Sequence, residues 1–145
     1  MKPFADASFI VAAFARCDEH NPRAWHWWNR HGAAVQTSRL VLFEAENTLR
    51  GFPRSGKCSE NDARNSIEGM NRAVLEGLIE RKDAPLHRLL PLARRLSMHH
   101  TPKNIHGAMD ILHVATALEI ASERFLTFDD RQGDMAEHEG LILIP

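Results

Sequence analysis

The chain has 145 residues, of which 43% are hydrophobic and 26% charged, which is typical of one globular domain with a single core. We therefore expect one domain over residues 1–145. The formal net charge of −1 excludes binding of nucleic acid through the overall field, so any such contact must come from a local basic cluster. The basic residues available for one, each of which could equally be ordinary surface charge, are Arg39, Arg50, Arg54, Lys57, Arg94, Arg95, Lys103 and Arg131.

Neither a secretion signal nor a membrane span is expected. The apolar run FIVAAFA has only the minimum length of a signal-peptide core, and Asp6 precedes it. No stretch approaches the ~20 apolar residues that a membrane-spanning helix needs. Cys17 and Cys58 form no C-x-x-C pair and are too few for a disulfide framework. These features predict a soluble, cytoplasmic protein whose thiols are structural.

The first third of the chain alternates short apolar segments with helical patterns. We expect a strand over residues 2–5, followed by a helix that runs to Phe14 and whose start is favoured by the side-chain acceptors of Asp6 and Ser8. A second helix after Pro22 and a strand over residues 33–36 follow. Thr37 or Ser38 is suited to cap a third helix, in which apolar residues recur at helical spacing up to Leu49.

The rest of the chain continues the alternation. Residues 51–59 are rich in turn-forming residues and predict a flexible connection to a long polar helix that runs from near Ser59 to Leu78. A strand over residues 79–82 and a helix from Pro85 to Leu96 follow, with Pro91 indicating a kink or a late start. The remaining segments are a loop over residues 97–108, a helix from Asp110 to Ala121, a strand over 124–128, a helix over 131–138 and a strand over 141–144.

Strands that alternate with helices in this order predict an α/β sandwich with a mainly parallel sheet. In such folds, functional residues gather at the edge of the sheet where the strands end. Asp6 and Asp129 each come directly after an expected strand. The positions of these two acids therefore agree with the predicted fold.

Four acidic residues stand beside predicted apolar elements, namely Asp6, Glu44, Asp110 and Asp129. Asp6 and Asp129 follow strands, Asp110 stands at the start of a helix, and Glu44 lies next to the apolar face of its helix. Carboxylates brought together repel each other by about 1 kcal/mol per pair at ~4 Å in water, and by several-fold more in a protein interior. A divalent cation with oxygen ligands, Mg2+ or Mn2+, would resolve this repulsion. Taken singly, Asp6 and Asp110 could equally be helix caps, and Asp129 could be a turn residue.

Three neighbouring side chains are assigned to other roles. Glu46 lies about 200° around the helix from Glu44, so we expect it to face solvent. Asp130 is expected to serve the turn in which it lies. His113 follows Asp110 by three residues, a spacing that could bind a transition metal, but we expect a histidine that is bonded within the domain.

Four segments give the chain a resemblance to PIN-domain ribonucleases, most closely to the VapC-type toxins of bacterial and archaeal toxin-antitoxin systems. They are FADASFIVAAF, TSRLVLFEAENTLR, AMDILHVATALEIASERFLTFDDR and AEHEGLILI. The resemblance covers nearly the whole length and implies a PIN-like three-layer α/β/α sandwich. The acidic quartet of that family falls on Asp6, Glu44, Asp110 and Asp129, and the polar positions Ser8, Asn47 and Thr127 match groups that orient carboxylates or waters. Residues 51–85 carry no motif of the family.

The resemblance implies an endoribonuclease that hydrolyses RNA phosphodiester bonds with water activated by Mg2+ or Mn2+. Asp6 and Asp110 would be the principal ligands, with one or two ions, and Glu44 and Asp129 would complete or orient the set. An antitoxin protein as partner and a homodimer are also implied. Independently of the resemblance, His99 and His100 are adjacent and therefore poorly placed to bind one metal together, so we expect loop residues that approach RNA.

Three other classes of protein also carry acidic residues after a first strand. The serious alternative is a non-catalytic PIN-like module that binds RNA or protein and has a metal-stabilised acidic pocket. A haloacid-dehalogenase phosphatase is excluded because Ser8 stands where that class has a second aspartate. A receiver domain is excluded because the segment after the late strand reads DDRQ, without the required lysine.

Overall fold

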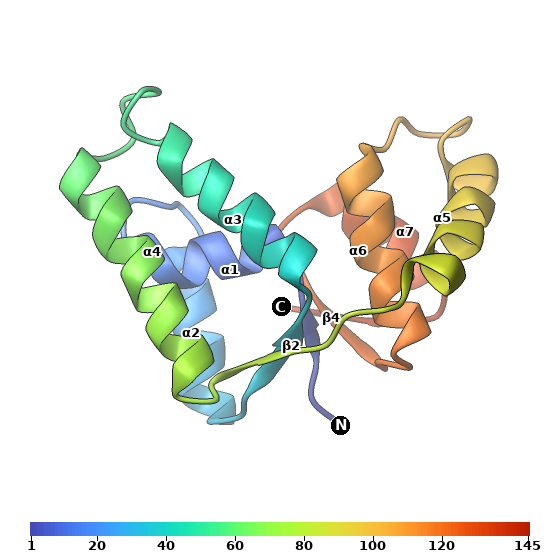
Figure 1. Cartoon of the computed structure of the whole chain (residues 1–145), viewed down its shortest axis with the longest axis horizontal. Coiled ribbons are helices and arrows are strands. Elements are labelled where there is room, and N and C mark those ends of the chain that lie inside the picture. Colours follow the sequence, from blue (N-terminus) through green and yellow to red (C-terminus); the bar gives the residue numbers. More distant parts are fainter.

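The computed structural model describes every residue from Met1 to Pro145 as five strands and seven helices in alternation (Figure 1). The strands are β1 (Phe4–Ala5), β2 (Val35–Thr37), β3 (Ile79–Arg81), β4 (Arg124–Leu126) and β5 (Ile142–Ile144). The helices are α1 (Ala7–Phe14), α2 (Asn21–His31), α3 (Arg39–Gly51), α4 (Glu60–Leu75), α5 (Leu86–His100), α6 (Ala108–Glu119) and α7 (Asp130–His138). None of these helices is long and apolar enough to span a membrane.

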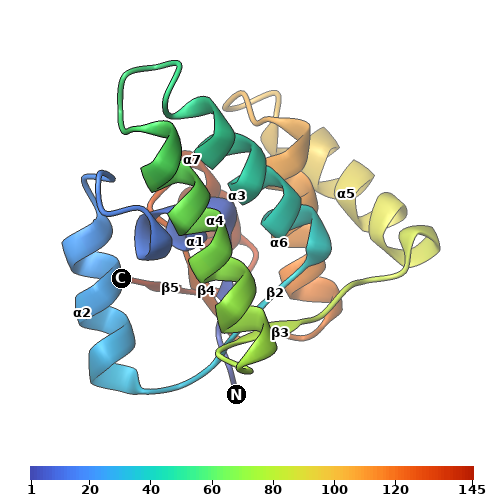
Figure 2. The same ribbon diagram turned by 60° about the vertical axis from the view of Figure 1, so that its left-hand side comes forward.

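The strands form one sheet in the order β3-β2-β1-β4-β5, and every neighbouring pair is parallel. Helices α1 to α4 pack together on one side of this sheet, and α5 to α7 pack together on the other side (Figures 1 and 2). The predicted three-layer α/β/α sandwich is therefore confirmed, with a sheet that is wholly parallel. The chain leaves the central strand β1 in both directions, and ligand-binding crevices of parallel sheets lie at such a reversal of strand order.

An aromatic cluster fixes the first helix against its neighbours. Phe9 on α1 is fully buried, and its ring centroid lies 5.6 Å from that of Trp27, 5.9 Å from that of Trp28 and 5.8 Å from that of Phe128. Trp27 and Trp28 belong to α2, and Phe128 lies between β4 and α7. One side chain thus holds together α1, α2 and the segment that leads to Asp129.

The third helix is capped by Ser38, whose Oγ accepts a hydrogen bond from the backbone N–H of Val41 at 3.2 Å. Thr37, the other candidate cap, is engaged elsewhere, because its hydroxyl donates to the carbonyl oxygen of Ala5 at 2.7 Å. This bond joins the end of β2 to the end of β1, directly before Asp6.

Several boundaries differ from the predicted ones. Helix α5 runs through Pro91 without starting late and continues to His100, because the buried Leu96 and His100 lie one turn apart on the same face. The prediction that His100 lies in a loop is therefore wrong: it ends α5, is 7% exposed, and its Nε2 lies 2.8 Å from Oε1 of Glu139.

The late strand and helix are also placed differently. Strand β4 stops at Leu126, because the N–H of Phe128 donates to the side chain of Ser8 and not to a neighbouring strand. Helix α6 begins at Ala108 and ends at Glu119, so Asp110 lies inside its first turn. Asp110 therefore does not open the helix as predicted.

Candidate metal-dependent active site

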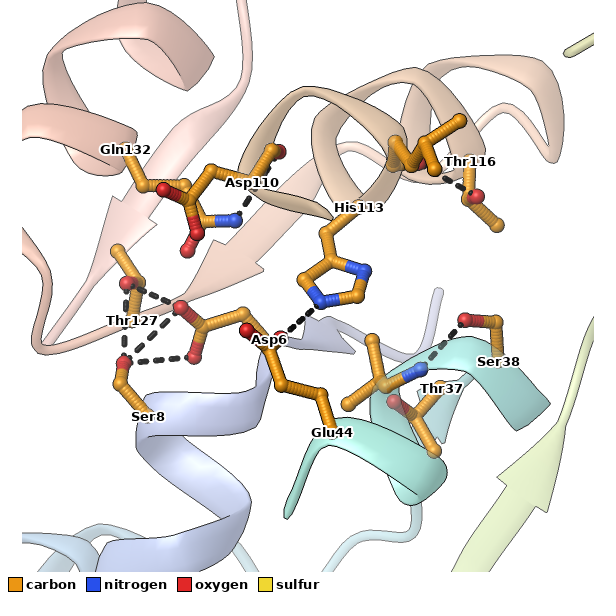
Figure 3. A network of polar contacts seen from close by, with 12 residues as sticks. Asp6, Ser8, Thr37, Ser38, Glu44, Asp110, His113, Thr116, Thr127 and Gln132 are labelled. Atoms are coloured by element: carbon orange, nitrogen blue, oxygen red, sulfur yellow. Dashed lines mark hydrogen bonds and ion pairs between the residues drawn. The ribbon is translucent and has the colours of Figure 1, made fainter. Parts of the chain in front are cut away.

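The four predicted acids line one cavity of about 320 Å3 at the carboxyl edge of the sheet. Figure 3 shows three of them, Asp6, Glu44 and Asp110. Asp6 follows β1, Glu44 lies on α3, Asp110 lies in the first turn of α6, and Asp129 caps α7. The structure thus brings together residues from both ends and the middle of the chain.

Asp6 is the most buried of these acids, with 1% of its surface exposed. It caps α1, because its Oδ1 accepts a hydrogen bond from the N–H of Phe9 at 2.9 Å. The hydroxyl of Ser8 donates to Oδ1 at 2.8 Å, and the hydroxyl of Thr127 donates to Oδ2 at 2.6 Å. Burial outweighs these three hydrogen bonds and raises the pKa of Asp6 to about 6.

Ser8 and Thr127 join Asp6 to the segment that carries Asp129 (Figure 3). Oγ of Ser8 accepts from the N–H of Phe128 at 2.8 Å, and Oγ1 of Thr127 accepts from the N–H of Asp129 at 3.0 Å. These two residues hold and orient the carboxylate, the contact expected of groups in the roles predicted for them. Asn47, the third polar residue predicted for such a role, is exposed on α3 and does not line the cavity.

Asp110 and Asp129 both line the cavity and are linked through Gln132. Oδ1 of Asp129 accepts from the N–H of Gln132 at 3.0 Å, and Nε2 of Gln132 donates to the carbonyl oxygen of Asp110 at 3.1 Å. Burial, followed by the charges of Asp129 and Glu44, raises the pKa of Asp110. The carboxylates are therefore near enough to repel each other.

Glu44 is held by His113, which is almost fully buried on α6. Nε2 of His113 donates a hydrogen bond to Oε2 of Glu44, while Nδ1 is buried without a partner in the chain (Figure 3). The prediction that His113 is bonded within the domain is confirmed, but its exclusion from the acidic cluster is wrong. Its spacing of three residues from Asp110, on the same face of one helix, was the signal.

Other residues of the cavity carried no signal in the sequence. Asp18 and His20 line it from the connection between α1 and α2, and the ring of His20 stacks on Phe128 with the centroids 4.6 Å apart. Gln132 lies in α7 and was likewise not predicted. Nothing in the local pattern of these segments indicates that they reach the carboxyl edge of the sheet.

Of the eight predicted basic residues, only Lys57 lines the cavity. Its Nζ lies 4.7 Å from the centroid of the Phe52 ring. Arg39, Arg50 and Arg95 are paired with the carboxylates of Asp83, Glu46 and Glu139. Glu46 is therefore directed away from the acidic cavity, as predicted, and Lys57 supplies the cavity's one lysine or arginine charge.

The donor chemistry of the cavity fits Mg2+ or Mn2+. The four carboxylates that line it offer oxygen atoms, the ligands that these ions prefer, and a bound cation would offset the repulsion that Asp129 and Glu44 exert on Asp110. As the side chains lie, no three His, Cys, Asp or Glu residues form a ready-made metal site. An ion would compete with His113 for Glu44 and with Ser8 and Thr127 for Asp6.

Comparison with known proteins identifies the family. A family model described as the PIN domain matches residues 4–138, whereas no curated protein matches the chain. The fold is similar to that of Mycobacterium tuberculosis VapC20, a sarcin-ricin loop cleaving toxin, with a TM-score of 0.74 and 19% identity over 99% of this chain and 100% of that chain. It is also similar to PAE2754 from Pyrobaculum aerophilum, with a TM-score of 0.64 and 18% identity over 99% of this chain and 89% of that chain. The chain belongs to the PIN domain family.

Proposed function

We propose that the protein is an endoribonuclease that depends on Mg2+ or Mn2+ and hydrolyses phosphodiester bonds of RNA. The observation that carries this proposal is the convergence of Asp6, Glu44, Asp110 and Asp129 on one cavity at the carboxyl edge of the sheet. Membership of the PIN domain family and the structural similarity to VapC20 support it. Asp6 and Asp110 would hold the ion, and Glu44 and Asp129 would complete or orient the set.

When bound, the ion supplies positive charge that acidifies a water molecule and stabilises the negative charge developing on the phosphate. The protein contributes position and electrostatics. Ser8 and Thr127 keep the carboxylate of Asp6 in one orientation, and His113 does the same for Glu44. Lys57 at the cavity provides a cation for a phosphate of the substrate.

Cleavage of RNA by the wild type and by Asp110→Asn, with Mn2+ and with chelator, tests the proposal. We expect cleavage only by the wild type with Mn2+, and a loss on the order of 10^3-fold in the variant, because the ion loses a principal ligand. Asp134→Asn is the matched control, since this aspartate is exposed on α7 and does not line the cavity. Equal cleavage by all samples would refute the proposed nuclease function. Stabilisation of the fold by Mn2+ without any cleavage would favour the non-catalytic binding module.

The hydrogen bond between His113 and Glu44 gives a second expectation. His113→Ala leaves Glu44 without its partner, so we expect cleavage to fall by about 10- to 100-fold. His113→Gln places an amide N–H near the position of the imidazole Nε2 and should restore most of the loss. The measurement is the initial cleavage rate at saturating Mn2+, with the Mn2+ concentration for half-maximal rate determined for each variant. Equal rates for the alanine and glutamine variants would contradict a positioning role.

We further propose that the nuclease is the toxin of a toxin-antitoxin pair and works as a homodimer in the cytoplasm. The support is the similarity to VapC20, whose description names a toxin. Expression of the wild type and of Asp110→Asn in a bacterial host tests the toxin role, because only the active enzyme should arrest growth. Co-expression with the gene product encoded next to it should restore growth, and sedimentation of the pure protein distinguishes dimer from monomer.

A further inference from the structure

The two cysteines of the chain lie against one surface cavity although they belong to different connections. Cys17 is exposed between α1 and α2, and Cys58 is partly buried between α3 and α4, directly before Ser59, the cap of α4. Both line the same cavity, together with Phe14, Asp62 and other residues. The two connections lie on the side of the molecule where α4 begins (Figure 2).

Burial, together with the neighbouring Cys17 thiol, raises the pKa of Cys58. The proximity of the two thiols rests on the cavity that both line. A raised pKa lowers the fraction of Cys58 that is present as the nucleophilic thiolate, and Cys58 is also the less exposed of the two side chains. The exposed Cys17 is therefore the residue that reacts first with an external oxidant.

We propose that Cys17 and Cys58 are a reversible modification site that reacts with low-molecular-weight disulfides and closes to an intramolecular disulfide. The Cys17 thiolate attacks one sulfur of oxidised glutathione, which forms a mixed disulfide and releases one glutathione thiol. The Cys58 thiolate then attacks the sulfur of Cys17 and releases the second glutathione. The protein loses two electrons and two protons, and both glutathione molecules leave reduced.

The disulfide would link two connections that both line the proposed catalytic cavity. Asp18 lines that cavity and follows Cys17 in the sequence, and Lys57 lines it and precedes Cys58. A bond between the cysteines would thus restrict the distance between Asp18 and Lys57, an acidic and a basic residue of that cavity. This consequence rests on the proposed nuclease function, because it concerns entry of RNA into that cavity, whereas formation of the disulfide does not.

Mass spectrometry of the native full-length chain after incubation with oxidised glutathione tests the modification. We expect a monomer lighter by two hydrogen atoms and a peptide pair that links Cys17 to Cys58, since the chain has no other cysteine. The reaction should be at least about tenfold faster in the native chain than in guanidinium, because the fold holds the thiols together. Stable glutathione adducts, disulfide-linked dimers only, or equal rates in both states would overturn the proposal.

Single variants and cleavage assays separate the two parts of the inference. Cys17→Ser and Cys58→Ser should each stop at a glutathione adduct or remain unmodified, and dithiothreitol should return the wild type to its original mass. Oxidised wild type should cleave RNA several-fold more slowly than reduced wild type, and the double serine variant should not respond to oxidant. Equal cleavage rates of the reduced and the oxidised protein would refute the claim that the disulfide affects the cavity. Failure of the reduced protein to cleave RNA would refute the proposed nuclease function but not the formation of the disulfide.

Discussion

Replacing Asp6 with asparagine should abolish RNA cleavage and at the same time make the protein more stable at neutral pH. Asp6 is buried, and its pKa is raised from 3.8 to about 6, so its ionised form disfavours the folded state. Two pKa units correspond to about 3 kcal/mol. Asparagine is uncharged and can still accept a hydrogen bond from the N–H of Phe9. The free energy of unfolding of Asp6→Asn should therefore exceed that of the wild type by up to about 3 kcal/mol at pH 7.

The sign of the pH dependence follows from the raised pKa. The stabilisation by protonated Asp6 is fully present below the unfolded-state pKa of 3.8 and is lost as the pH rises to about 6. The difference in the free energy of unfolding between Asp6→Asn and the wild type should therefore be largest above about pH 6 and vanish below about pH 4. Urea unfolding in chelator at both ends of this range measures it.

The same variant should lose cleavage activity by on the order of 10^3-fold, because it removes a carboxylate that we propose as a principal ligand of the ion. Mn2+ should raise the unfolding midpoint of the wild type and leave that of Asp6→Asn nearly unchanged. Asp134→Asn, which removes an exposed carboxylate outside the cavity, should behave like the wild type in both assays. A destabilised Asp6→Asn at pH 7 would show that the carboxylate is needed for folding rather than for the ion.

Phe9→Ala should strongly destabilise the protein. The ring of Phe9 is fully buried among Trp27, Trp28 and Phe128, and a phenylalanine truncated at such a site costs about 3–5 kcal/mol. For a chain of this size the midpoint of thermal unfolding should fall by roughly 10 °C or more. The measurement is the free energy of unfolding in urea, followed by circular dichroism.

Phe43→Ala provides the matched comparison, because Phe43 is 64% exposed on α3. The same atoms are removed there without leaving a cavity, so the free energy of unfolding should change by no more than about 0.5 kcal/mol. The Phe9 ring also supports Phe128, which leads to Asp129. Comparable losses in the two variants would mean that the aromatic cluster contributes no packing energy of its own.

The sequence predicted the features that depend on local pattern. Asp6 stands out because a carboxylate follows a strand and precedes an apolar helix, and both properties can be seen within ten residues. The alternation of strands and helices allowed the parallel sheet to be predicted, because parallel strands need helical crossovers. Ser8 was predicted through family resemblance, and its hydroxyl indeed bonds to Asp6.

The features that the sequence did not predict depend on packing between distant segments. His113 was set aside because one histidine on a helix does not reveal its partner, and its contact with Glu44 on α3 exists only after α3 and α6 converge. His20 reaches the cavity by stacking on Phe128, which is likewise a long-range contact. The end of α5 was misplaced because the burial of His100 is decided by Glu139, far along the chain.

The bond between Asp6 and Thr127 joins residues 121 positions apart, and it has a consequence for synthesis of the protein. Because β1 must pair with β4 before this bond can form, a nascent chain that has not passed β4 lacks the complete cavity. A protein that attacks RNA would therefore remain harmless to the ribosome that is making it until nearly all of the chain has emerged.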